Sequence, residues 1–193
     1  MSSETVVEQD KTYWLSLDPG VNMTGLTVSE VSEGYKVIDT ILVKNNRAFT
    51  PEEKVVEKTQ GPRAVKILAI VNKVKEVLSQ YPIETIIIEA PFYNRLTPQA
   101  YGSLLEVIFA LKYTVLVPED RHYLLIEPTL VKKLFTGHGM AKKEAMKQFL
   151  ATKISTGDIT MTKNIELLSE HEIDSAAIGF VYWVTRQLPK PEV

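Results

Sequence analysis

One short apolar run, at residues 83–89, limits the fold of this 193-residue chain more than any other feature. It places Ile86, Ile87 and Ile88 in succession, without the alternation of apolar and polar residues that marks a strand with one wet face. Such a run is typical of a central strand that is buried on both faces of its sheet. Helices must then pack on the sheet, so the run predicts an α/β protein.

The rest of the chain predicts the remaining elements of a mixed sheet of five strands, three antiparallel and then two parallel, flanked by helices. The other strands are expected at 13–18, about 24–30, 35–43 and 121–126, the first three forming an antiparallel meander with Gly20 and Gly34 in its turns. Apolar periodicity predicts helices at 51–79 (with a break at Gly61-Pro62), 98–113, 129–135, 140–152 and 170–187. Ser169 and Glu172 form a possible capping box for the last helix.

Composition excludes several classes of protein and site. The chain has no cysteine, so it has no disulfide, thiolate metal site or cysteine nucleophile. Residues 1–12 are expected to be a flexible tail that resembles no signal or transit peptide, and residues 13–188 a single domain. No apolar run approaches the roughly 20 residues that span a bilayer. These features predict a cytoplasmic protein without a membrane partner.

Charge is distributed unevenly along the chain. The net charge is −2, but residues 128–153 contain six lysines and one acid, a local charge of +5 that leaves −7 for the remainder. A basic patch beside clustered acids suits a local phosphate contact next to a metal site. On charge alone, two solvated amphipathic helices with lysines on their outer faces explain the pattern better.

Four residues suggest a metal-dependent site. Asp18 ends the first strand and Glu89 ends the fourth, so their carboxylates share one sheet edge if these strands are neighbours. His171 and Asp174 stand three apart, on one face of the last helix. Buried carboxylates are costly unless a cation compensates them, and oxygen ligands suit Mg²⁺ or Mn²⁺.

Each of these residues also has an ordinary structural explanation. Asp18 precedes Pro19-Gly20 and is compatible with a simple turn. His171 fits a half-buried or surface position near the helix cap, and Asp174 is an acid favoured by the helix dipole. Glu89 has the weakest alternative, because no turn chemistry explains a glutamate after three isoleucines. The ordered set favours the metal site.

The motifs together resemble the RuvC family of Holliday-junction resolvases, which are RNase H-like nucleases of the retroviral-integrase superfamily. The resemblance spans about residues 13–187. It rests on Leu17-Asp18-Pro19-Gly20 followed by Thr24-Gly25, on Glu89-Ala90-Pro91-Phe92, on Val131-Lys132, on Gly137-His138-Gly139-Met140-Ala141-Lys142-Lys143, and on His171-Glu172-Ile173-Asp174. It implies an RNase H-like fold.

The resemblance also implies a role for each acidic residue. Asp18, Glu89 and Asp174 would be metal ligands. His171 would occupy the fourth catalytic position, where it would bind the second metal or position the attacking water, with Glu170 as a competitor for it. The site would hold two Mg²⁺ ions, or Mn²⁺ in their place, and hydrolyse phosphodiester bonds.

The DNA contacts implied by the resemblance lie outside this cluster. Lys132 and Lys143, eleven residues apart, would hold phosphates of the cleaved strand, with Lys142 beside them. Phe92 would stack on a base near the junction centre, and Tyr93 would share or replace it. Phe92 also fits an ordinary loop anchor packed on the core.

A homodimer is the simplest assembly for two symmetric nicks in a four-way junction. The helix at 98–113 is apolar over roughly 200°, well beyond the ~100° that one core contact requires. Its excess apolar surface is available for a second copy, although burial on two sides within one subunit explains the pattern equally well.

The resulting hypothesis is a Mg²⁺-dependent, structure-selective endodeoxyribonuclease that resolves Holliday junctions in recombination, repair or phage DNA processing. Its expected location is the cytoplasm of a bacterium or of a phage-infected cell. The alternative is an RNase H-fold nuclease that acts on RNA, on RNA–DNA hybrids or on other branched DNA. The acidic net charge and the unmatched segment 154–169 depart from the family pattern, and residues 189–193 are expected to be disordered.

Overall fold

A six-stranded sheet is the frame of the structure, a computed structural model that describes residues 11–93, 95 and 98–187. Its strands are β1 (Thr12–Asp18), β2 (Met23–Val31), β3 (Tyr35–Lys44), β4 (Ile83–Glu89), β5 (His122–Ile126) and β6 (Ile159–Met161), in the spatial order β5-β4-β1-β2-β3-β6. The first three strands form an antiparallel meander, and β4 and β5 run parallel to β1. The predicted mixed sheet is therefore confirmed.

The sixth strand, β6, corrects the prediction of five. It has three residues and pairs in parallel with the start of β3, between Tyr35 and Val37. A strand this short carries no readable alternation of apolar and polar residues. It lies within the segment 154–169, for which the resemblance gave no counterpart.

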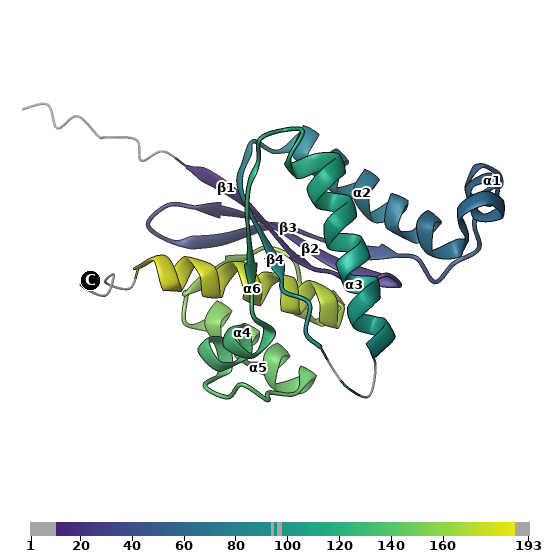
Figure 1. Ribbon diagram of the computed structural model, residues 1–193. Coiled ribbons are helices and arrows are strands. Elements are labelled where there is room, and N and C mark those ends of the chain that lie inside the picture. Colours follow the sequence, from purple (N-terminus) through teal and green to yellow (C-terminus); the bar gives the residue numbers. More distant parts are fainter. Residues whose placement is uncertain (1–10, 94, 96–97, 188–193) are drawn as a thin grey trace, which may run out of the picture.

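Helices cover both faces of the sheet (Figure 1). They are α1 (Pro51–Gln60), α2 (Pro62–Gln80), α3 (Pro98–Leu111) with its π-helical extension η1 (Lys112–Leu116), α4 (Pro128–Thr136), α5 (Lys143–Ser155), the 3-10 turn η2 (Ile165–Leu167) and α6 (Glu170–Gln187). The predicted break at Gly61 is confirmed: this glycine has a φ of 82° and separates α1 from α2. The predicted start of α5 at residue 140 was wrong, because Lys142 has an extended backbone and caps a helix that begins at Lys143.

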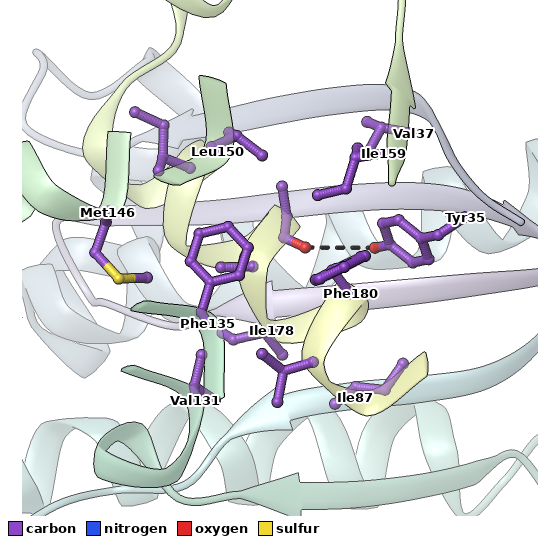
Figure 2. Close-up of a cluster of buried hydrophobic side chains, with 14 of the residues drawn as sticks. Tyr35, Val37, Ile87, Val131, Phe135, Met146, Leu150, Ile159, Ile178 and Phe180 are labelled. Atoms are coloured by element: carbon purple, nitrogen blue, oxygen red, sulfur yellow. Dashed lines mark hydrogen bonds between the residues drawn. The ribbon is translucent and has the colours of Figure 1, made fainter. Parts of the chain in front are cut away.

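The isoleucines of β4 are buried on both faces of the sheet, as the apolar run at residues 83–89 predicted. Ile86 and Ile88 belong to the core that α2 and α3 cover. Ile87 belongs to the opposite core, where Figure 2 shows it near Ile178 and Phe180 of α6. Because all three side chains are almost completely buried, β4 is fixed as a central strand.

Close packing and hydrogen bonds hold α6 across the sheet. A Cβ atom on Gly179 would stand 2.2 Å from the Tyr35 hydroxyl oxygen, so only glycine fits there. The Tyr35 hydroxyl donates to the Ala176 carbonyl (Figure 2). The Ser16 hydroxyl donates to the Ser175 carbonyl at 2.7 Å. These contacts hold the middle of α6 against β1 and β3. The first turn of the helix lies at the end of β1 from which the chain enters the Pro19-Gly20 turn, where His171 contacts Asp18.

Both chain ends lie mostly outside the described residues, so the predicted tail at 1–12 and disorder at 189–193 stay predictions. Thr12 already belongs to β1, one residue before the predicted domain start. Within the described part of the chain, no helix combines the length and the apolar character needed to cross a bilayer.

Candidate active site

Asp18 and Glu89 lie at the same edge of the sheet because their strands are parallel neighbours. Leu17 of β1 pairs with Ile88 of β4, and each carboxylate belongs to the next residue along its strand. Asp18 is buried, with 8% of its surface exposed. The condition that the sequence left open, adjacency of β1 and β4, is met.

The first turn of α6 completes the cluster. His171 and Asp174 lie on this turn, and the His171 carbonyl oxygen packs against Gly25, the residue that pairs with Asp18 across β1 and β2. The His171 Nδ1 atom is 2.6 Å from Oδ2 of Asp18. Gly25 allows this approach, since a Cβ atom there would come within 1.9 Å of the His171 oxygen.

A buried polar network fixes the start of α6. The predicted capping box is confirmed: the Ser169 N–H donates to the Glu172 carboxylate, and the Glu172 N–H donates to the Ser169 hydroxyl. The other partners of Glu172 leave no signal in the sequence. The Lys163 ammonium donates to this carboxylate at 2.9 Å and to the Thr40 hydroxyl of β3. No motif marks Lys163, because its partner is nine residues away and becomes a neighbour only when α6 has packed.

Shared negative charge shifts the acids of the cluster. Burial raises the pKa of Glu89 to about 8, and the carboxylates of Asp18 and Asp174 contribute to the shift. Burial, followed by the charge of Asp18, raises the pKa of Asp174 to about 7. Lys132 opposes both shifts. Carboxylates from three elements therefore lie close enough to repel one another, which is the electrostatic setting that a divalent cation relieves.

His171 and Glu170 take different positions in this cluster. The hydrogen bond with Asp18 raises the pKa of His171 against the opposing effect of burial, and it places a proton on Nδ1 because a carboxylate only accepts. Glu170 forms an ion pair with Lys143. Its Oε1 atom is 3.7 Å from the His171 Nε2 atom. The imidazole therefore contacts the acidic cluster directly, and Glu170 lies at its border.

The three predicted phosphate-binding lysines line one hollow beside the acids. Lys132 comes from α4, while Lys142 and Lys143 stand at the start of α5. Together with Asp174 they line a cavity of about 430 Å³. The structure thus brings the lysines next to the carboxylates, although α4 and α5 are separated in sequence from both strands.

Phe92 and Tyr93 lie on the loop that follows β4. Their side chains are 57% and 56% exposed, so the alternative of Phe92 as a core-packed loop anchor was wrong. The Tyr93 ring packs edge-on against Tyr101 of α3, with centroids 5.6 Å apart. An exposed aromatic ring beside an acidic cluster is free to stack on another planar group.

The donor set suits a hard divalent cation. Carboxylate oxygens of Asp18, Glu89 and Asp174 are the ligands that Mg²⁺ and Mn²⁺ prefer, and their mutual repulsion favours a positive charge between them. Within the described residues, no three His, Asp or Glu side chains are already arranged as a metal-binding group. Instead, the Asp18 carboxylate is hydrogen-bonded to His171, and it lies beside the Glu89 carboxyl group.

This repulsion predicts that the metal-free protein becomes less stable as the pH rises. A carboxyl group with a folded-state pKa of about 8 and an ordinary value of 4.5 costs no stability below pH 4.5 and a growing amount as the pH approaches 8. Glu89→Gln removes this cost, so it should be more stable than wild type by about 2–4 kcal/mol at pH 8.5. Urea unfolding in EDTA from pH 5.5 to 8.5 measures the difference.

The matched control is Glu84→Gln, an exposed glutamate on the same strand. At pH 8.5 Glu89→Gln should gain more stability over wild type than this control does. A gain no larger than that of the control would contradict the burial of charge at Glu89.

Two known proteins are similar to this chain in sequence. No protein-family model matches it. A crossover junction endodeoxyribonuclease RuvC from Ehrlichia canis is 28% identical over 169 residues, covering 84% of this chain and 89% of that protein. One of the same name from Ehrlichia chaffeensis is 32% identical over 141 residues, covering 72% of this chain and 80% of that protein.

The fold also matches a solved structure. Thermus thermophilus RuvC, in complex with Holliday junction substrate, superimposes with a TM-score of 0.64 at 21% identity, over 91% of this chain and 95% of that chain. At this identity the match speaks for the fold, and it agrees with the RNase H-like arrangement that the motifs implied.

Proposed function

This chain belongs to the RuvC family of crossover junction endodeoxyribonucleases, and on that basis we propose that it cuts four-way DNA junctions by paired, symmetric nicks. The observation that carries the proposal is the meeting of Asp18, Glu89 and Asp174 at one sheet edge, bordered by Lys132 and Lys143. Carboxylates beside lysines suit a phosphodiester substrate held next to a divalent cation. The proposed cleavage would serve DNA recombination and repair, in the cytoplasm of a bacterium or of a phage-infected cell.

Each residue then has a chemical task. Asp18, Glu89 and Asp174 would hold two Mg²⁺ ions, or Mn²⁺, and these ions supply activation of a water molecule and stabilisation of the leaving oxygen. His171 keeps a proton on Nδ1 through its hydrogen bond to Asp18, which orients the ring and leaves Nε2 away from that carboxylate. Lys132 and Lys143 would hold phosphates of the cleaved strand.

A second copy would provide the second nick, and α3 offers the surface for it. Val107, Ile108 and Leu111 of this helix are buried within the subunit, but Phe109 is 53% exposed. Phe109 and Leu68 of α2 line an apolar hollow of about 860 Å³. Light scattering after size exclusion is expected to give twice the chain mass of 21.8 kDa.

The direct test is cleavage of an immobile four-way junction with Mg²⁺, beside a linear duplex and an RNA–DNA hybrid of matched sequence. Paired nicks at symmetric positions in the junction alone are the expected result. Cleavage of the hybrid with an untouched junction would replace this proposal with the ribonuclease alternative.

Lys143→Ala is expected to weaken junction binding and reduce its salt dependence. Each phosphate contact contributes about 0.9 to the slope of log K against log [salt], so the slope should fall by about 1. Fluorescence anisotropy between 50 and 200 mM salt measures it. Lys75→Ala, at an exposed position on α2, is the control and should leave the slope unchanged. An unchanged slope in Lys143→Ala would remove this residue from the phosphate contacts.

A further inference from the structure

A second lysine of α5 shares the environment of Lys143. Lys147 stands one helical turn further on, and each of the two lysines is paired with a carboxylate at, or just before, the start of α6. Lys143 pairs with Glu170, and the Lys147 ammonium donates to Glu166 at 2.6 Å. Two ion pairs in register therefore join α5 to the start of α6.

The paired groups border the acidic cluster. Lys143, Lys147, Glu170 and Asp174 line a hollow of about 170 Å³. The rise of four helical residues separates the two lysines by about 6 Å along α5, which is close to the spacing of neighbouring phosphates in one strand. A strand that runs along α5 could therefore meet Lys143 with one phosphate and Lys147 with the next.

Both ion pairs are open to solvent. The side chains of Lys143 and Glu170 are 67% and 41% exposed, and those of Lys147 and Glu166 are 36% and 70% exposed. Exposed lysine–glutamate pairs contribute little to stability, so breaking them costs the fold little. A phosphate oxygen offers the ammonium group an acceptor of the same charge and similar geometry, and can therefore replace the carboxylate.

We propose that Lys147 extends the DNA contact beyond Lys143, and that Glu166 and Glu170 occupy these two lysines as internal substitutes for phosphate until DNA displaces them. This inference rests on the proposed function. It adds Lys147 to the DNA contacts and lets two carboxylates compete with DNA for the lysines. DNA that presents two phosphates along α5 replaces both carboxylates, whereas DNA that reaches one lysine gains less. The arrangement reconciles a DNA-binding site with the acidic net charge of the chain.

The test is a double-mutant cycle on Lys147 and Glu166. Dissociation constants for a four-way junction are measured in EDTA, so that no cleavage intervenes, for wild type, Glu166→Gln, Lys147→Ala and the double variant. Glu76→Gln is the matched control, because it removes the same charge from an exposed lysine–glutamate pair with Lys73 on α2.

Glu166→Gln is expected to bind the junction about two- to fivefold more tightly than wild type, beyond any effect of Glu76→Gln. The gain should disappear when Lys147 is alanine, and Lys147→Ala should lower the salt slope by about 1. A gain in affinity equal to that of Glu76→Gln, or one that persists when Lys147 is alanine, would overturn this inference. Either result would leave the proposal of junction cleavage standing. A wild type that neither binds nor cuts the junction would remove the proposed function and this inference with it.

Discussion

Asp18→Asn and Glu89→Gln are each expected to lower the rate of junction cleavage by on the order of 10³-fold or more, while junction binding survives. Both substitutions keep the shape of the side chain and replace a carboxyl group of the cluster at the ends of β1 and β4 with an amide. Metal-assisted stabilisation of the reacting phosphate contributes several kcal/mol, and each 1.36 kcal/mol is tenfold in rate. Neither amide adds a negative charge beside the DNA, so each variant should bind the junction at least as tightly as wild type.

Single-turnover cleavage of a labelled junction measures the rate, and anisotropy in EDTA measures binding. Mg²⁺ should raise the melting temperature of wild type more than that of either variant, which tests the ligand role without activity. Glu84→Gln, exposed on β4, is the control and should behave as wild type in all three measurements. Loss of binding in both variants with the fold intact, or retention of cleavage, would contradict the assignment.

Gly25→Ala is expected to be the most damaging substitution for stability near the site. Its Cβ atom would lie 1.9 Å from the His171 carbonyl oxygen and 2.9 Å from the Glu172 nitrogen, both of which are backbone atoms that no rotamer change can move away. The start of α6 must then shift from β2, and His171 with it. We expect a loss of about 3–5 kcal/mol.

Thermal unfolding measures this loss, which corresponds to a fall in melting temperature of about 10 °C for a domain of this size. Cleavage should fall as well, since Gly25 pairs with Asp18 and seats the helix that carries His171 and Asp174. Gly34→Ala is the control, because its Cβ atom would meet nothing within 4 Å. A melting temperature that matches the control would show that α6 does not rest on Gly25 in this way.

The order and type of the long elements could be read from the chain. Ile86, Ile87 and Ile88 indicated a strand buried on both faces, and the structure divides them between the two cores. The predicted helical region at 51–79 is broken at Gly61, where the backbone has a positive φ. Elements of seven or more residues leave a period that local sequence can display.

The three-residue strand β6 and the long-range partners of polar side chains could not be read in this way. The three residues of β6 are held by pairing with β3, and that pairing depends on where α5 ends. The bond from Lys163 to Glu172 and the ion pair between Lys147 and Glu166 are made by ordinary polar side chains, which look like solvated surface in the sequence. Such contacts are decided by which elements pack together.

The candidate site shows the same division. Local chemistry placed Asp18 and Glu89 at strand ends and put His171 and Asp174 on one helix face, because those positions follow from the periods of strand and helix. Their meeting depended on the parallel pairing of β1 with β4 and on a gap over Gly25 that admits the His171 carbonyl. Periodicity is a property of neighbours along the chain, whereas the pKa values of Glu89 and Asp174 depend on burial and on charges that only packing brings close.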